Sequence, residues 1–142
     1  MVDKSGTDKM WNTADSADLF RRKLCDGELC LGTCVTYADP TITETLATVL
    51  DFVWIDMEHN PLNMEAINQF VAFANDRSYT AKRSDSQPRM AIVARFPPYG
   101  GGDPWIVKQA LDIGLMGVVF NTVNNREEAI AAVRSMRYPP QR

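Results

Sequence analysis

Four short apolar segments alternate with four segments of helical spacing, and this alternation constrains the fold of the chain more than any other feature. The strand-like segments are residues 29–35, 52–56, 90–94 and 117–120, and each is followed by apolar residues spaced as on one side of a helix. The short segments show no clean alternation of apolar and polar residues, as is typical of parallel strands covered by helices. The pattern predicts an α/β fold of four parallel βα units preceded by one helix.

Residues that begin and end helices lie between these segments. Ser16 can cap the first helix and Gly27 can end it. Asp39-Pro40 and Asp103-Pro104 are helix starts, because aspartate caps and proline fits the first helical position. In the helix that follows Asp39-Pro40, we expect one side to carry the apolar residues Ile42, Leu46, Val49 and Leu50. The last helix can be capped by Asn124 or Asn125.

Composition and charge exclude several classes of partner. The chain has 142 residues, a net charge of −3 and a sequence pI near 5.1, whereas surfaces that bind nucleic acids or anionic membranes are basic. No apolar run reaches the roughly 20 residues that span a bilayer. Residues 1–15 lack the apolar stretch of a secretory signal. We expect a cytoplasmic protein with a disordered lead-in over residues 1–15, one domain over residues 16–142, and neither nucleic acid nor membrane as a partner.

The three cysteines, Cys25, Cys30 and Cys34, contain no C-x-x-C pair. A zinc site needs closer pairing and more ligands. Because free cysteine is most often buried, we expect these residues to be small buried side chains in a reducing compartment.

The number of βα units leaves two architectures open. Four units could form a small open doubly wound sheet, or they could be half of an eight-unit barrel, which takes about 250 residues. Periodicity does not decide between them. Residues 79–89 are polar and join a helix to the next strand, so we interpret them as a solvated insertion on the amino-terminal face of the sheet, without a function.

Polar residues at the carboxyl end of the second strand are the first candidates for a site. In βα folds, catalytic residues gather at the carboxyl ends of the strands. The chain's single histidine, His59, lies three residues after Asp56. An aspartate this close can orient an imidazole and make His59 a general base. Taken alone, this spacing favours a solvated surface turn, because short Asp-His pairs are common.

The third strand also ends in a candidate, Arg95, whose planar guanidinium suits a carboxylate or an enolate oxygen. The alternative is an ordinary surface ion pair. The glycine run in residues 99–104 is not followed by Lys-Ser/Thr, so it is no P-loop, and we interpret it as a flexible loop.

Several motifs together resemble the HpcH/HpaI aldolase/citrate lyase family. The most specific is Ile55-Asp56-Met57-Glu58-His59 within residues 52–61. Residues 31–33, 93–97, 103–108 and 111–114, both Asp-Pro pairs and Tyr138-Pro139-Pro140 support it, and the resemblance spans residues 19–142. It implies the N-terminal half of a (β/α)₈ TIM barrel.

The resemblance also implies a chemistry. Such enzymes are class II aldolases, which make or break a C–C bond beside a pyruvate-type 2-oxo acid with the help of a divalent metal, Mg²⁺ or a similar ion. By position, Asp56 and His59 match the catalytic acid/base pair, which acts through a metal-bound water, and Arg95 matches the arginine on the 2-oxo oxygen. Trp54 shares strand parity with Asp56 and is expected to line the substrate site.

The expected metal ligands, a glutamate and an aspartate on later strands, are absent from these 142 residues. We therefore expect a 2-oxo acid and an aldehyde as partners, a homo-oligomer, and little activity of this chain alone. Two alternatives stay open: a non-catalytic half-barrel that self-associates, and a small α/β binding domain.

Overall fold

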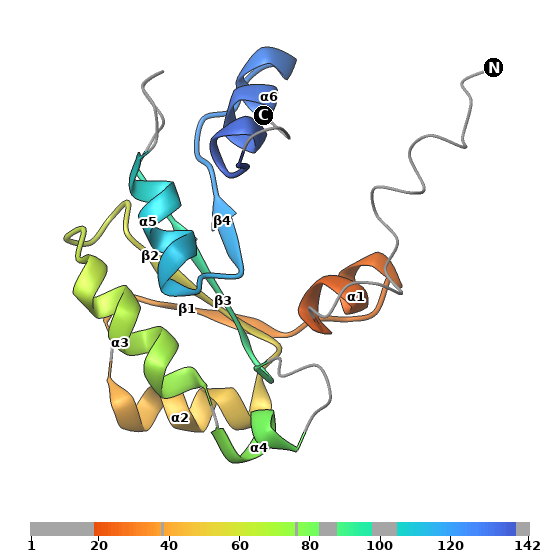
Figure 1. Ribbon diagram of the computed structural model, residues 1–142, viewed down its shortest axis with the longest axis vertical. Coiled ribbons are helices and arrows are strands. Elements are labelled where there is room, and N and C mark those ends of the chain that lie inside the picture. The colour runs from red at the N-terminus through yellow and green to blue at the C-terminus, as the bar shows by residue number, and fades with distance from the viewer. Residues whose placement is uncertain (1–18, 38, 76, 83–87, 98–104, 139–142) are drawn as a thin grey trace.

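Four parallel strands form a single sheet in the computed structural model, which describes residues 19–37, 39–75, 77–82, 88–97 and 105–138. The strands are β1 (Gly32–Val35), β2 (Phe52–Asp56), β3 (Ala91–Arg95) and β4 (Gly117–Val119). They pair in the order β1-β2-β3-β4, and all three pairs are parallel. The predicted α/β fold of four adjacent parallel strands is confirmed (Figure 1).

Six helices in these ranges accompany the sheet: α1 (Leu19–Cys25), α2 (Pro40–Val49), α3 (Met64–Ala74), α4 (Arg77–Ala81), α5 (Trp105–Ile113) and α6 (Arg126–Ser135). Side chains cap three of them, because the first N–H groups of a helix have no partner within it. Asp39 accepts from the N–H of Ile42 at 2.9 Å, Asn63 caps α3, and Asn125 caps α6. None of the helices in the described ranges is long and apolar enough to cross a membrane.

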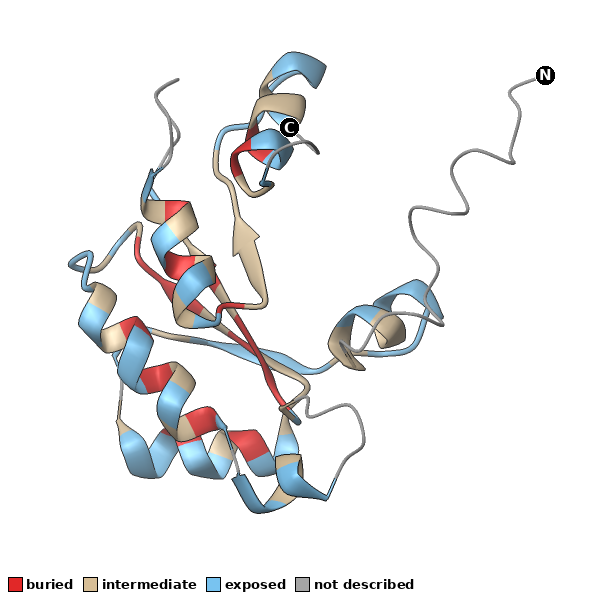
Figure 2. Ribbon diagram, in the orientation of Figure 1, coloured by how far each residue is buried: buried red, intermediate tan, exposed pale blue. Residues whose placement is uncertain are grey.

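One face of the sheet is packed against α2, α3 and α5 (Figures 1 and 2). Alternate strand residues on β2 and β3 supply this face, because successive side chains point to opposite sides of a strand. The buried cluster between sheet and helices contains Val53, Ile55, Ile92 and Ala94 from the strands, and Ala47, Ile67, Phe70, Val107 and Ala110 from the helices. This cluster is the hydrophobic core.

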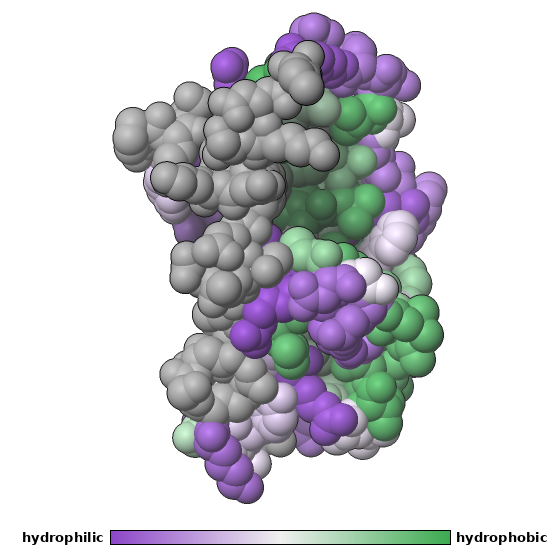
Figure 3. All heavy atoms as spheres, turned by 90° about the vertical axis from the view of Figure 1, so that its right-hand side faces the viewer, coloured by the Kyte–Doolittle hydropathy of each residue, from purple (hydrophilic) through white to green (hydrophobic). Residues whose placement is uncertain are grey.

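The opposite face, called here the open face, carries Phe52, Trp54, Val93 and Arg95, all of them half-buried. At its amino-terminal end it meets α1, where the rings of Phe20 and Phe52 lie 5.1 Å apart. A Cβ atom at Gly32 would lie 2.5 Å from the Phe52 ring, so any other residue at position 32 would require that ring to move. Seen from the side of α1, the molecule shows exposed and partly recessed apolar surface (Figure 3).

Three expectations about burial and extent are wrong in whole or in part. In α2, Leu46 and Leu50 pack against the core as expected, but Ile42 is 41% and Val49 68% exposed, and the buried residues are Thr43 and Ala47. The α2 stripe was assigned from apolar residues alone, but the side that meets α3 carries the smaller residues, which allow close packing. The first strand covers residues 32–35 rather than 29–35, and residues 77–81 of the region around the polar insertion form a helix, α4.

The cysteines are also not buried. Cys25 and Cys34 are exposed and Cys30 is half-buried, and all three are free. Cys34 lies on β1, at the edge of the sheet, with Trp54 as its partner in the register. Its side of the strand is the open face, so no helix covers it. Ser16 and the pair Asp103-Pro104 lie outside the described residues.

Candidate active site

Asp56 and Arg95 meet at the carboxyl ends of β2 and β3. They are register partners in adjacent parallel strands, so their side chains leave the same face of the sheet at the same height. Arg95 Nε donates to Asp56 Oδ1 at 3.2 Å, and Arg95 Nη2 donates to Asp56 Oδ2 at 2.6 Å. This bidentate arrangement fixes the plane of the guanidinium.

The Asp56 carboxylate also organises the turn after β2. Asp56 Oδ1 accepts from the backbone N–H of Glu58 at 3.0 Å and of His59 at 3.2 Å, and Asn60 Nδ2 donates to the Asp56 carbonyl at 3.1 Å. Asp56 is 6% exposed. The hydrogen bond from Arg95 is the main reason why the pKa of Asp56 lies at about 2; burial opposes the shift and the backbone donors support it. Asp56 is therefore an ionised anchor and a poor proton acceptor.

A second carboxylate, Glu58, faces the same guanidinium. Glu58 Oε2 lies 3.1 Å from Arg95 Nη1 and 3.5 Å from His59 Nε2. The guanidinium also stacks on Trp54, with Cζ 5.0 Å from the ring centroid, which is within cation–π range. The Trp54 indole N–H is buried and has no hydrogen-bond partner among the described residues. The hydrogen bond that Arg95 donates to Asp56 raises the pKa of Arg95, which keeps the guanidinium charged.

The guanidinium has donors left after these contacts. It carries five N–H groups, and two of them are donated to Asp56 while Nη1 pairs with Glu58. One N–H on each terminal nitrogen is outside these three contacts with described residues. Both donors lie in the guanidinium plane and can bind oxygens of a carboxylate or of a planar 2-oxo acid.

Three of the four residues singled out from the sequence lie together, with Arg95 in contact with the other two, and the fourth is connected differently from expectation. Trp54, Asp56 and Arg95 form one cluster. The His59 side chain is 69% exposed and contacts Glu58, whereas Asp56 reaches only the His59 backbone N–H. The predicted orientation of the imidazole by Asp56 is therefore absent, because Arg95 and two backbone donors already occupy that carboxylate. Glu58 was missed, since its partner lies 37 positions away on another strand and no spacing rule connects the two.

The carboxyl end of β4 adds a strained loop beside the cluster. Asn121 Nδ2 donates to the carbonyl of the buried Phe96 at 2.7 Å and so connects the ends of β3 and β4. Thr122 has φ of 56°, which is uncommon for a β-branched residue. Such strain persists only where the surroundings enforce it.

The described residues do not fit a metal ion. No group of three His, Cys, Asp or Glu side chains in the described ranges is arranged to hold one. Asp56 and Glu58, the two carboxylates of the cluster, are both directed at Arg95. The expected divalent cation therefore has no binding site among the described residues. The glycine run of residues 99–104 lies outside the described residues.

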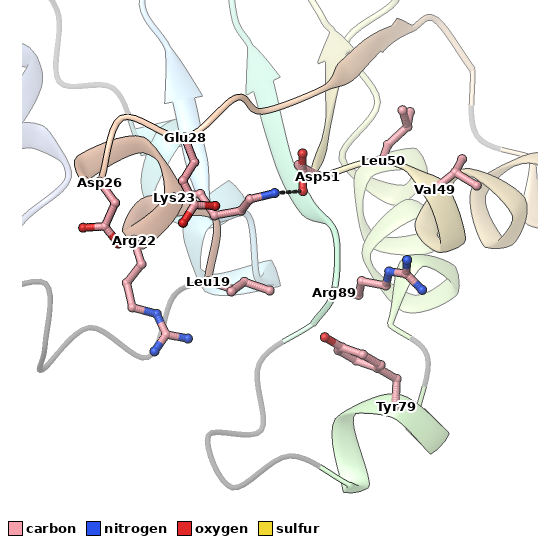
Figure 4. A pocket seen from close by; sticks show the side chains of 10 residues that line it. All are labelled: Leu19, Arg22, Lys23, Asp26, Glu28, Val49, Leu50, Asp51, Tyr79 and Arg89. Carbon is pink, nitrogen blue, oxygen red and sulfur yellow. Dashed lines mark hydrogen bonds and ion pairs between the residues drawn. The ribbon is translucent and has the colours of Figure 1, made fainter.

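A separate cavity of about 540 Å³ lies at the opposite, amino-terminal end of the strands (Figure 4). Lys23 from α1 and Asp51 form an ion pair across it at 2.7 Å, and Asp51 also accepts from the Leu31 N–H at 3.0 Å. Tyr79 and Arg89, from the segment interpreted as a solvated insertion, line it as well. Its charges are mixed in sign, and it is far from the end of the sheet where Asp56 and Arg95 meet.

Comparison with known proteins places this geometry in context. A hydroxypyruvate/pyruvate aldolase of Roseovarius nubinhibens is 38% identical over 122 residues, which are 85% of this chain and 42% of that protein. A 5-keto-4-deoxy-D-glucarate aldolase of Enterobacter sp. strain 638 is 34% identical over 124 residues, 86% of this chain and 43% of that protein. No protein-family model matches the chain.

Solved structures agree with the sequence comparison. An HpcH/HpaI aldolase from Desulfitobacterium hafniense superposes with a TM-score of 0.67 and 27% sequence identity, over 84% of this chain and 42% of that chain. The chain thus spans less than half the length of the relatives that it matches. The described sheet corresponds to half of their barrels.

Proposed function

Since the chain belongs to the HpcH/HpaI aldolase family, we propose that it supplies the 2-oxo-acid-binding and proton-transfer part of an aldolase that makes or breaks a C–C bond beside a pyruvate-type 2-oxo acid. Both curated relatives described above are named as aldolases of oxo acids. The aldehyde is the second substrate in this proposal.

The observation that carries the proposal is the arrangement around Arg95. Its guanidinium is held on one edge by Asp56, faces Glu58, and rests on Trp54. Two N–H groups remain for the substrate, and their fixed plane suits the coplanar oxygens of a 2-oxo acid and the oxyanion of its enolate. Donors that are fixed before the reaction stabilise developing charge without reorganisation.

His59 is the proton-transfer group in this proposal. Asp56, with its pKa at about 2, is too weak a base. His59 is exposed, three residues from the end of β2, on the side where Glu58 approaches it. In the cleavage direction, the base removes the proton of the hydroxyl next to the breaking C–C bond, an aldehyde leaves, and the enolate takes a proton at its methylene carbon.

We also propose a requirement for a divalent cation such as Mg²⁺, held by residues outside the described ranges. Asp56 and Glu58 against Arg95 give the cluster a net charge of −1 when all three are ionised, so Arg95 alone should bind an anionic 2-oxo acid weakly, and a further cation would strengthen binding and stabilise the enolate. For the same reason we expect little aldolase turnover from the 142-residue chain alone.

Ligand binding tests the proposal on the chain itself. Oxalate, a planar dianion that imitates the enolate of pyruvate, should perturb the NMR signals of the Trp54 indole and the His59 ring in a saturable way. Arg95→Lys should abolish this response, because lysine cannot supply the planar fork. Glu65→Gln, an exposed helix position, is the matched control and should bind normally. Equal binding by the Arg95→Lys variant would contradict the proposal.

Turnover tests the reaction in a hybrid of this chain and the remaining part of the Roseovarius aldolase. With Mg²⁺ in D₂O, the hybrid should exchange the methyl protons of pyruvate. His59→Ala should lower that rate by about 10²- to 10⁴-fold, as expected for loss of a general base. Exchange at the full rate without His59 would remove it from the mechanism.

A non-catalytic, self-associating half-barrel is the second candidate, and the open face favours it. Strand β1 is exposed along three of its four residues, and among the described strands β1 and β4 each have only one neighbour. Open strand edges and uncovered faces promote association. A homo-oligomer in sedimentation analysis, without any oxalate response, would favour this candidate.

The free cysteines fit a reducing compartment such as the cytoplasm.

A further inference from the structure

Glu58 lies between the guanidinium and the imidazole of the candidate site, and we infer that it is the positioning residue that connects His59 to Arg95. This inference rests on the proposed function, in which Arg95 binds the 2-oxo acid and His59 moves the proton. It assigns the orientation of the imidazole to Glu58 and leaves Asp56 with the guanidinium and the turn.

Asp56 has no remaining capacity for the imidazole. Its Oδ1 accepts from Arg95 Nε and from two backbone N–H groups, and its Oδ2 accepts from Arg95 Nη2 at 2.6 Å. Its pKa of about 2 keeps it ionised and bound to Arg95. Turning it toward His59 would break the bidentate pair and leave a half-buried guanidinium short of a partner.

The Glu58 side chain contacts both the Arg95 guanidinium and the His59 ring, whereas the Asp56 side chain contacts only the guanidinium and backbone N–H groups. The Asp56 turn directs the side chain of residue 58 back over the end of β3, where one oxygen, Oε2, is 3.1 Å from Arg95 Nη1 and 3.5 Å from His59 Nε2. The Glu58 side chain is 19% exposed, so water screens its charge less than at an open surface. The same carboxylate oxygen thus contacts both groups that the proposed reaction needs.

The contact with Glu58 restricts the orientation of the His59 ring. His59 is 69% exposed, and without a partner its ring would sample several rotamers. Contact with Glu58 favours the rotamers that keep the imidazole beside the substrate held by Arg95. Misplacing a reacting group by about 1 Å can cost roughly 10²-fold in rate, so such a contact matters for turnover even if it contributes little to folding.

NMR of the 142-residue chain tests this connection directly. The chain has one histidine, so the His59 ring signal needs no assignment. Arg95→Lys, which keeps the charge but changes the fork, should shift the His59 signal when Glu58 is present and leave it in place in the Glu58→Gln background. Glu65→Gln should not alter the response. An Arg95→Lys shift of equal size with and without the Glu58 carboxylate would overturn the inference.

A second variant, which keeps the negative charge, distinguishes loss of the bridging contact from misfolding. Glu58→Asp keeps the charge and shortens the side chain by one methylene, so it cannot reach both groups and should reduce the coupling as Glu58→Gln does. Full coupling in Glu58→Asp would show that general charge, and not bridging, connects the two residues.

Kinetics in the hybrid enzyme separate a positioning role from a structural one. Glu58→Gln should lower kcat for pyruvate proton exchange by roughly 10- to 100-fold, with KM nearly unchanged, because Asp56 still holds Arg95 in place. A rise in KM at constant kcat would overturn the assignment. Failure of oxalate to bind the unsubstituted chain would count against the proposed function, whereas the NMR comparison would still decide the role of Glu58.

Discussion

The two faces of the sheet are built from the same strands and have opposite properties. On the helix-covered face, Val53, Ile55 and Ala94 are almost fully buried and belong to the hydrophobic core cluster. On the open face, the intervening Trp54 and the end residues Asp56 and Arg95 form a polar cluster held by hydrogen bonds and charge. Because successive side chains of a strand point to opposite faces, the residues that stabilise the core and the residues of the candidate site are direct neighbours in the sequence.

The two faces should therefore tolerate different kinds of amino-acid substitution. Burial stabilises the covered face through the area removed from water, so volume and apolar character matter there. The cluster on the open face depends on the direction of donors and acceptors, so substitutions of equal size can still destroy it. Three substitutions and one change of pH test this contrast, from the largest expected effect to the smallest.

Ile55→Ala should have the largest effect on stability. Ile55 is 2% exposed in the centre of the core, and truncation removes buried methyl groups and leaves a cavity. We expect a loss of about 2–5 kcal/mol in the free energy of unfolding, measured by urea denaturation. A loss no larger than that of an exposed control such as Glu65→Gln would mean that the core is not packed as described.

Asp56→Asn should cost less stability but more function. Asparagine has the same size, yet it cannot accept the bidentate pair from Arg95 as an anion, and we expect a loss of about 1–3 kcal/mol. Oxalate binding should fall strongly in the same variant, because the guanidinium plane is no longer fixed. Ile55→Ala, studied at a temperature where it remains folded, should keep its oxalate response. The opposite ranking would break the division between the faces.

Acid should weaken the open-face cluster before the core. The pKa of Asp56 is lowered in the folded state to about 2 from 3.8, so its contribution to stability is fully present above pH 4 and is lost as the pH falls through 2. The free energy of unfolding should decline over this window. In Asp56→Asn this part of the decline should disappear, and an unchanged pH profile in that variant would contradict the assignment.

Cys34→Ala should have the smallest effect. Cys34 is exposed on the edge strand, so we expect a change within about 0.5 kcal/mol, as for surface substitutions in general. The wild-type thiol should react promptly with a thiol reagent under native conditions. Slow labelling together with a large loss of stability would indicate that the open face is covered in solution, as the self-associating candidate requires.

Local signals in the sequence predicted most of the fold. Residues 52–56 form β2 as predicted, and the caps Asp39 and Asn125 lie where predicted, because these features depend on a few neighbouring residues. The buried side of α2 could be predicted only in part, since the burial of Thr43 and Ala47 depends on how α2 packs in the core and beside α3. The same applies to Cys34, whose exposure depends on its place at the sheet edge.

The site was partly predictable for the same reason. Asp56 and Arg95 both end apolar strands, so parallel pairing brings them together once the fold is known. The partner of His59 was not predictable, because the choice between Asp56 and Glu58 depends on which carboxylate the guanidinium of another strand occupies. Such competition is decided in three dimensions and leaves no spacing pattern in one sequence.

The contact between Gly32 and Phe52 has an evolutionary consequence. A side chain at position 32 would overlap the Phe52 ring, and moving that ring would change its packing against Phe20 of α1. The two positions, on neighbouring strands, should therefore vary as a pair in related sequences: a larger residue at 32 should coincide with a smaller one at 52. Where that exchange occurs, position 20 should change with it, because the side chains of all three positions meet at the same place between α1, β1 and β2.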